Sequence, residues 1–431
     1  MTSEKRRMSD CEHTADCPNC FATPFETLKN RIPRMSLLLQ SRRMGAALAV
    51  LVIAAVFPGA VLANPKIAVD VSSGRVIEHE QAFQRWYPAS LTKLMTIYVA
   101  FKAVASGQMT METPVTMSVH AAKEPASKMY FNPGTRFPLD SALKYLMVKS
   151  ANDVAVAIGE AVSGSEEAFV EEMNAAARQI GMTSSRFINP NGLPGAGQYT
   201  TARDMALLAV ALRREFPQFA HYFGYEGFAV GKKSHANYNL LIGRFPGADG
   251  MKTGFICASG FNQVSSATRN GKTVVSVVFG AASQEERAEE SARLLHKALT
   301  TTALGKSTLH TLPPYGEGRD QLADISGYIC TKEARAARYE GRDVEGKMVL
   351  NSPYLVPMTR EPRLVQAPIG GPVASVEIAL SRIPIPVPRP GGVLAGQVEP
   401  FAASAFTAPD KAAEVAPIRS GVPVPVPRPE I

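Results

Sequence analysis

The chain has 431 residues, of which 45% are hydrophobic and 19% charged, a balance typical of a globular protein with a sizeable core. Its formal net charge of +8 would suit nucleic acid or an anionic surface, but lysine and arginine are scattered rather than gathered in basic blocks, which argues against nucleic-acid binding. The five cysteines are too few for a disulfide framework, and Cys257 and Cys330 form an isolated pair whose spacing predicts nothing.

An export signal is predicted near the start of the chain. Arg42 and Arg43 precede an apolar run over 46–61, which Ala63 ends as a small residue suited to cleavage. The run is short for a membrane span, so we predict a signal peptide over 35–63, with a retained anchor as the alternative. Residues 1–34 resemble no export signal and are predicted to be an N-terminal extension that is left out if translation begins at Met35.

The next elements are read from their hydrophobic period. Residues 66–71 and 76–80 alternate around a Ser-Ser-Gly turn, which predicts a hairpin. Pro88 begins a helix that ends near Gly107. Further helices are predicted at three places: 139–162 (two helices split by a polar break at 149–152), 166–180 and 202–214.

Strand patterns return late in the chain. Residues 259–267 and 273–279 are β-rich runs around an Arg-Asn-Gly turn, and a helix over 285–299 follows them. Strands at both ends with helices between them predict an α+β fold, in which one antiparallel sheet joins distant sequence and carries an inserted helical subdomain. This catalytic domain is predicted to span 64–304.

The remainder of the chain is predicted to be an appendage. Residues 305–350 form a short C-terminal extension, and residues 351–431 hold 16 of the 32 prolines. Two near-copies of alternating proline, at 383–390 and 422–429, favour extended polyproline II and cannot pack a core. We expect a disordered tail here, with docking to a protein partner or to a wall polymer as the alternative.

Three short motifs carry the chemistry. They are Ser90-Leu-Thr-Lys93 at a predicted helix start, Ser150-Ala-Asn152 in the break between helices, and Lys252-Thr-Gly254 leading into a predicted strand. Each motif alone is common, but all three in this order on these elements form a pattern described for penicillin-binding proteins and class A β-lactamases.

The residue types fit a serine nucleophile served by a lysine base. Ser90 and Lys93 share a helix face, and a second cation, Lys252, would lower the pKa of Lys93 so that it accepts the serine proton. Ser150 would relay a proton to the leaving amine, and Asn152 would hold the substrate peptide.

The third motif predicts where a substrate lies. Lys252 and Thr253 offer a charge and a hydroxyl to a substrate carboxylate, and Gly254 lets the strand edge approach closely. The backbone N–H groups of Ser90 and Phe255 would form an oxyanion hole.

The region from about 66 to about 299 resembles the low-molecular-mass penicillin-binding proteins, the family of D-alanyl-D-alanine carboxypeptidases. The similar stretches are Tyr87–Thr96, Asn189–Pro194, Tyr199–Asp204 and Asp249–Phe255. The resemblance implies a β-lactamase/penicillin-binding-protein-like transpeptidase fold. It also implies a Ser90 acyl-enzyme that releases the terminal D-alanine of peptidoglycan stem peptides, covalent inhibition by penicillins and other β-lactams, no cofactor and no metal.

The predicted export signal implies a periplasmic protein, or one at the outer face of the bacterial inner membrane. The resemblance carries a further expectation about binding. An arginine early in the last helix, here Arg287, would grip the substrate carboxylate, with a surface ion pair to Glu286 or Glu290 as the alternative. Many relatives carry a β-rich domain and an amphipathic membrane helix after the catalytic domain. The short 305–350 extension and the proline-rich tail match neither of these.

Other functions were weighed. Motifs of α/β-hydrolases, zincins and P-loop enzymes are absent, and the seven histidines form no ligand cluster. A DD-endopeptidase that cuts crosslinks would use the same residues. A class A β-lactamase would need a deacylating carboxylate, and residues 189–197 contain none. An inactive wall-binding scaffold is disfavoured because every motif residue is present.

Overall fold

The computed structural model describes residues 64–340 and 348–370. The predicted signal peptide, the extension before it and the proline repeats therefore lie outside the described residues. Within the described part of the chain, no helix combines the length and the apolar character that crossing a membrane would need.

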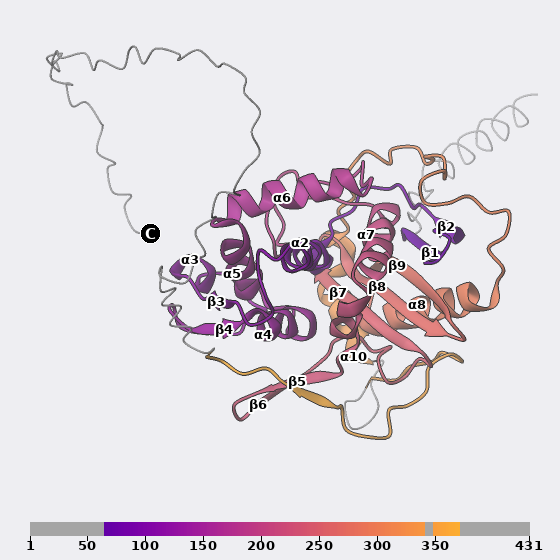
Figure 1. Ribbon diagram of the computed structural model, residues 1–431. Helices are drawn as coiled ribbons and strands as arrows, with labels where there is room; N and C mark the ends of the chain where they lie inside the picture. Colours follow the sequence, from indigo (N-terminus) through magenta and orange to yellow (C-terminus); the bar gives the residue numbers. More distant parts are fainter. Residues whose placement is uncertain (1–63, 341–347, 371–431) are drawn as a thin grey trace, which may run out of the picture. The chain divides into compact units, whose positions relative to one another are not determined.

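The molecule is organised around one antiparallel sheet of five strands in the order β2-β1-β9-β8-β7 (Figure 1). The strands are β1 (Lys66–Asp70), β2 (Val76–Glu80), β7 (Ala248–Ile256), β8 (Gly260–Arg269) and β9 (Lys272–Ala281). Because β1 pairs with β9 from Lys66↔Val278 to Asp70↔Val274, the early hairpin is joined to the late strands, as the sequence predicted. Strand β7 lies at the edge and, among the described strands, pairs only with β8.

Both faces of the sheet are covered. Along β9, Val275 and Val277 pack into one core with the helical part of the molecule, whereas Val274 and Val278 pack into a second core with α8 (Gln284–Thr300). This follows from the two-residue period of a strand, which turns alternate side chains to opposite faces. Because the sheet is packed between the helical part and α8, β7 and its edge are held in a fixed position.

The helical subdomain lies between β2 and β7 in sequence and contains the predicted helices. Its elements are η1 (Ala89–Thr92), α2 (Lys93–Ala105), α3 (Val119–Ala122), α4 (Leu139–Lys144), η2 (Tyr145–Lys149), α5 (Asn152–Ser163), α6 (Glu166–Gln179), α7 (Ala202–Glu215) and η3 (Pro217–Gly224), with a small ribbon of β3 (Pro114–Thr116) and β4 (Arg136–Pro138). The α2 helix runs through its middle and is buried on nearly every side. The motifs at 90–93 and 150–152 are therefore each held in place by packed helices.

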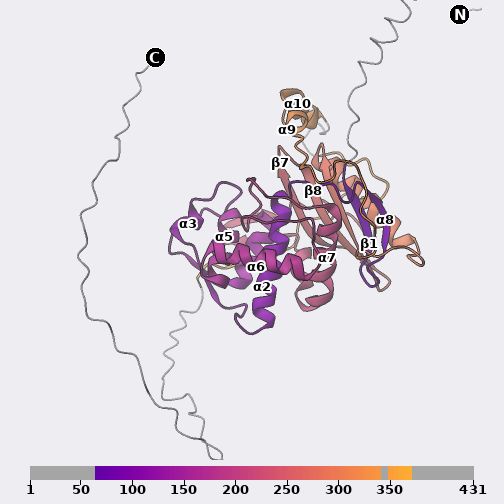
Figure 2. The same cartoon turned by 90° about the horizontal axis from the view of Figure 1, so that it is seen from above.

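After α8 the chain returns to the end of the sheet. Two short helices, α9 (Ser326–Ile329) and α10 (Lys332–Glu340), lie beyond the end of β7 (Figure 2). A disulfide between Cys257 and Cys330 joins them to the residues that follow β7. Sequence spacing predicted no pairing for these two cysteines, because 73 residues separate them and only the fold brings them together.

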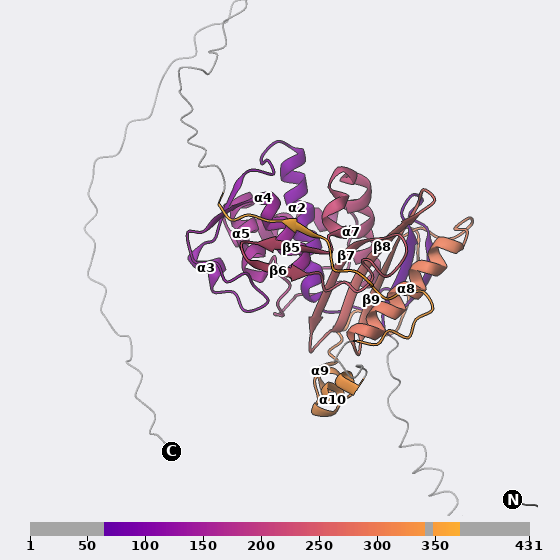
Figure 3. The same cartoon turned by 90° about the horizontal axis from the view of Figure 1, so that it is seen from below.

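Residues 348–370, here called the strap, cross from α8 to the helical subdomain (Figure 3). The strap ends in β10 (Leu364–Gln366), which pairs in parallel with β5 (Gly227–Val230), and β5 pairs with β6 (Lys233–Ala236). Tyr145 donates a hydrogen bond to the Ala367 carbonyl over 2.7 Å. The boundary predicted at residue 351 thus lies inside the folded part, because β10 completes a sheet whose other strands lie more than 120 residues earlier.

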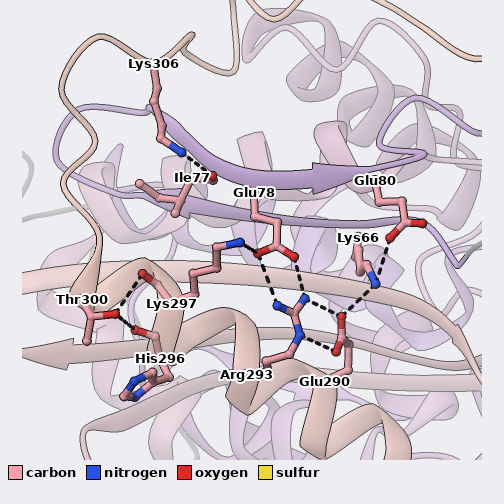
Figure 4. A network of polar contacts seen from close by, with 10 residues as sticks. All are labelled: Lys66, Ile77, Glu78, Glu80, Glu290, Arg293, His296, Lys297, Thr300 and Lys306. Carbon is pink, nitrogen blue, oxygen red and sulfur yellow. Dashed lines mark hydrogen bonds and ion pairs between the residues drawn. The ribbon is translucent and has the colours of Figure 1, made fainter.

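On the far side of the sheet, an ion-pair network joins β1 and β2 to α8 (Figure 4). Glu78 accepts hydrogen bonds from Arg293 and pairs with Lys297, both at 2.6 Å. Lys66 bridges Glu80 and Glu290 at 3.0 Å each. These contacts attach the N-terminal hairpin to the last helix of the domain.

Candidate active site

The first motif places Ser90 and Lys93 in contact. Ser90 lies in η1, and Lys93 begins α2 one turn later, so both side chains share one face. Lys93 is fully buried, and its Nζ lies 3.0 Å from Ser90 Oγ. The same Nζ lies 2.7 Å from Asn152 Oδ1, which ties the first motif to the second. Lys93 is therefore held by neutral oxygens and contacts no carboxylate in the part of the chain that the structure describes.

The charge state of Lys93 follows from this environment. Burial is the larger cause that lowers the pKa of Lys93 well below its ordinary range, and the charge of Lys252 is the second cause. Asp153 and Glu124 oppose both effects more weakly. The sequence predicted a lowered pKa for a buried Lys93 beside Lys252, and the structure shows both causes, with burial the larger. An amine in this state can accept a proton near neutral pH.

The second motif stands at the break between η2 and α5. Ser150 has a φ of 62°, in the left-handed region that non-glycine residues rarely occupy, and Ala89 beside Ser90 has a φ of 47°. Within the described residues, Ser150 Oγ is buried without a hydrogen-bond partner. Asn152 donates to the Pro125 carbonyl over 2.9 Å, which orients its amide toward Lys93. Strained backbone and a hydroxyl group without a hydrogen-bond partner thus lie close to Ser90.

The third motif lies on β7 itself rather than ahead of a strand. A Cβ at Gly254 would lie 3.1 Å from the backbone nitrogen of Ser90 and 3.2 Å from that of Leu91, so a larger residue would push β7 and η1 apart by a few tenths of an ångström. Ser90, Gly254 and Phe255 line the same cavity. The oxyanion hole expected from the N–H groups of Ser90 and Phe255 stays a prediction.

Lys252 and Arg287 place two buried cations beside β7. Lys252 is 1% exposed, and burial together with the charge of Arg287 lowers its pKa to about 7. Its Nζ donates to the Thr253 carbonyl over 2.9 Å. Arg287 is 3% exposed, and burial lowers its pKa to about 10, which leaves it charged at neutral pH.

The ion pair considered for Arg287 is absent from the described residues. Glu290 instead pairs with Arg293 and Lys66, and Glu286 accepts a bond from the Ala282 backbone. Arg287 donates to the Tyr238 carbonyl over 3.2 Å, and its Nε has no partner in the described structure. Its guanidinium therefore retains donors for an anion.

These groups converge on a cavity of about 230 Å³. Its lining residues come from all three motifs, from β7, β8 and α8, and from the loop after β6: Ser90, Ser150, Tyr238, Thr253, Gly254, Phe255, Phe261, Gln284 and Arg287. Lys93, Asn152 and Lys252 stand behind this lining, through the contacts given above. The structure thus brings every predicted site residue to one place.

Sequence reasoning missed several neighbours. Tyr238 lines the cavity from a loop that carries no motif. Asn191, in one of the family-like stretches, offers its carbonyl to Lys93 Nζ and donates to Glu124 Oε2 over 2.8 Å. Burial raises the pKa of Glu124. A carboxylate therefore does approach the site, but from the α3 end rather than from residues 189–197.

Comparisons with known proteins agree with this geometry. A family model described as D-alanyl-D-alanine carboxypeptidase matches residues 53–283. The chain is 33% identical over 243 residues to D-alanyl-D-alanine carboxypeptidase DacF of Bacillus subtilis, covering 55% of this chain and 62% of that protein. It is 35% identical over 305 residues to D-alanyl-D-alanine carboxypeptidase DacA of Haemophilus influenzae, covering 67% and 78%.

A solved structure shows the same fold. Penicillin-binding protein D2 of Listeria monocytogenes, in its ampicillin-bound form, superposes with a TM-score of 0.51 at 26% identity, covering 56% of this chain and all of that one. The α+β transpeptidase fold expected from the sequence is thereby confirmed. The chain spans 62% of the length of DacF, so the likeness to that relative concerns only part of it.

Proposed function

The chain belongs to the D-alanyl-D-alanine carboxypeptidase family, and on that premise we propose that it removes the terminal D-alanine of peptidoglycan stem peptides through an acyl-enzyme on Ser90. One observation carries this proposal. A fully buried lysine with a strongly lowered pKa lies 3.0 Å from a serine hydroxyl that opens into a cavity. That pair can generate an alkoxide-like nucleophile without a histidine or a metal ligand set.

Acylation begins when Lys93 accepts the proton of Ser90. The serine Oγ attacks the carbonyl of the penultimate D-alanine, and a C–O bond forms. The negative oxygen that develops is bound by the N–H groups of Ser90 and Phe255. When the C–N bond breaks, Ser150 passes a proton from Lys93 to the leaving amine, and the terminal D-alanine departs.

Deacylation repeats these steps with water as the nucleophile. Lys93 takes a proton from water, the hydroxyl adds to the ester carbonyl, and the C–O bond to Ser90 breaks as the serine regains its proton. Asn152 holds the substrate amide during both steps. Lys252, Thr253 and Arg287 bind the terminal carboxylate, which explains why two cations remain buried without an anion of the protein.

The same site supports covalent inhibition by β-lactams. A β-lactam presents a carbonyl and a carboxylate in the relation that the cavity serves, and opening its ring leaves no group to depart. The Listeria monocytogenes protein in its ampicillin-bound form shares this fold. Hydrolysis of crosslinks, the DD-endopeptidase activity, would use the same residues and differ only in the leaving group.

We further propose that the protein is exported, with the signal peptide at 35–63 and the catalytic domain beginning at residue 64. The Cys257–Cys330 disulfide supports this, because disulfides persist in oxidising compartments. The place of action would be the periplasm or the outer face of the inner membrane, where peptidoglycan lies. The catalytic domain proposed for 64–304 would be completed by the strap.

Mass spectrometry of the purified full chain after benzylpenicillin tests the proposal. We expect one adduct of the mass of benzylpenicillin on the peptide that contains Ser90, and none in Ser90→Ala. Release of D-alanine from a diacetyl-Lys-D-Ala-D-Ala peptide should disappear in the same variant. An unmodified protein with intact penicillin would reject the acyl-enzyme, and rapid consumption of penicillin would indicate a β-lactamase instead.

A further inference from the structure

A second cavity, of about 320 Å³, adjoins the first one at the end of β7. The two cavities share the residues Phe255, Phe261 and Gln284 as a common wall. Phe255 is 41% exposed, and its ring lies 4.3 Å from that of Phe261, centroid to centroid. We call this space the outer cavity. The reaction described above makes no use of it.

The outer cavity carries charges of both signs. Arg335 and Arg338 line it from α10, and Glu285 lines it from the first turn of α8. The ring of Phe261 is 5.6 Å from Arg338 Cζ and 5.8 Å from Arg287 Cζ, so one aromatic side chain contacts the cations of both cavities. Two guanidinium groups against one carboxylate leave the outer cavity net positive.

The α9–α10 segment is fixed in place rather than loosely attached. The Cys257–Cys330 disulfide joins it to the residues after β7, and the Ile325 N–H donates to the Ala258 carbonyl over 3.0 Å. Arg338 Nη1 donates to the Ile329 carbonyl over 2.8 Å. A cavity held by a covalent bond and by such contacts has its shape before a ligand arrives, which lowers the entropic cost of binding.

The direction of the substrate along β7 places its upstream part in the outer cavity. In the reaction proposed above, the terminal carboxylate binds at Lys252 and Thr253, and the reacting carbonyl binds at the N–H of Phe255. A peptide that adds to the β7 edge therefore runs antiparallel to β7, and its earlier residues pass toward Cys257. The outer cavity stands at that end.

From this geometry we propose that the outer cavity is a subsite for the residue that precedes D-Ala-D-Ala, and that it selects a side chain ending in both a carboxylate and an ammonium group. Arg335 and Arg338 take the carboxylate, Glu285 takes the ammonium group, and the aromatic wall covers the methylene stem. The matching substrate class is a peptide with a diamino dicarboxylic acid, such as diaminopimelate, at this position. The inference rests on the function proposed above.

Paired peptides test the subsite. The ligands are two acetyl-X-D-Ala-D-Ala peptides in which X is meso-diaminopimelate or L-lysine, because their side chains differ by a single carboxylate. Calorimetry on the full chain carrying Ser90→Ala measures both dissociation constants without turnover. We expect the diaminopimelate peptide to bind about tenfold more tightly, the value of one charge-assisted contact. Equal dissociation constants, or no binding of the diaminopimelate peptide, would overturn the proposal.

Substitutions in α10 locate the effect. Arg335→Gln and Arg338→Gln, each added to Ser90→Ala, should each reduce the preference at least threefold, and together they should abolish it. Lys332→Gln, on the same helix but outside the cavity lining, should leave the preference unchanged. A preference that survives the double substitution would place the selectivity elsewhere and reject the subsite.

Penicillin separates this inference from the proposed function. In chains that retain Ser90, Arg335→Gln should form the benzylpenicillin adduct as rapidly as the unsubstituted chain, because the phenylacetyl side chain of that ligand carries no charged group for Arg335 to bind. An unsubstituted chain that forms no adduct would reject the proposed function, while the dissociation constants would still decide the subsite.

Discussion

Charged side chains connect distant parts of the chain at two places. At one place the charged groups are buried without a counter-ion, and at the other they are paired and partly exposed. At the motif cluster, Lys93, Lys252 and Arg287 are at most 3% exposed and contact no carboxylate of residues 64–340 and 348–370. In the β2–α8 network on the far side of the sheet, Glu78 is paired with both Arg293 and Lys297 and keeps partial contact with water. The first place lowers the pKa of its lysines, and the second lowers the pKa of its carboxylate.

The difference separates reactivity from stability. Burying a cation without a counter-ion opposes folding, so such groups persist where a substrate supplies the missing charge or where a neutral amine is needed. Paired charges at a half-exposed surface stabilise the fold slightly and react with nothing. Three measurements test whether the two groups of charges differ in this way.

The largest effect is expected from Lys93→Met. Loss of the base should slow acylation of Ser90 by benzylpenicillin about 10²–10⁴-fold. The melting temperature should not fall, because the substitution removes a buried amine and fills its place with an apolar chain of similar length. Stopped-flow acylation and calorimetric melting measure the two quantities, with Lys102→Met on the same helix as the control. A large loss of stability would show that Lys93 stabilises the fold, which would contradict its assignment to reactivity alone.

The second effect concerns pH. Acylation by benzylpenicillin, a carboxylate, should decline as the pH rises above about 7, because Lys252 loses its proton and its attraction for that carboxylate. The decline can reach about tenfold per pH unit at most, as for the loss of one proton. On the acidic side the rate should rise as Lys93 becomes neutral, well below the usual lysine range.

Lys252→Arg provides the matched comparison, since it keeps a positive charge across this interval. The descending limb near pH 7 should then vanish, even if the rate at every pH is lower. Rate constants measured from pH 5 to pH 10 decide the matter. A wild-type rate that stays level between pH 7 and pH 9 would show that Lys252 keeps its proton.

The smallest effect is expected in the network. Burial alone would raise the pKa of Glu78, but hydrogen bonds from Arg293 and Lys297 lower it to about 2. Its stabilisation is therefore present above the ordinary value of 4.5 and disappears as the pH falls toward 2. Glu78→Gln should cost about 1–2 kcal/mol at pH 7, after allowance for screening by water. Denaturant unfolding should show no difference from the parent at pH 2, and acylation should be unchanged.

Much of this arrangement could be predicted from local sequence. The hairpin at 66–80, the helices and the pair β8–β9 follow from hydrophobic period and turn residues, and the motifs identified the cavity-lining residues of their own segments. Arg287 could also have been placed, because it shares a helical face with Ser291, Leu294 and Ala298, all of which are buried. That face predicts a buried guanidinium rather than a surface ion pair.

The rest depends on contacts between distant residues. Strand β7 contains two glycines and a lysine and has no regular alternation, so it is a strand because β8 pairs with it. Glu124 meets Asn191 across 67 residues, and nothing local in either segment indicates the contact. The disulfide and the β5–β10 pairing are of the same kind, which is why the outer cavity had no counterpart in the sequence.

The strap has a consequence for the order of folding. Its strand β10 pairs with β5 from 137 positions earlier, at Leu364↔Gly227, while β1 pairs with β9 from more than 200 positions later. Because such pairings close long loops, the chain has a high contact order and is expected to fold slowly. During synthesis the helical subdomain would wait for its last strand until the chain has been made to residue 366. The chain would therefore lack its long-range strand pairings for most of its synthesis, and in that state it could pass through an export channel.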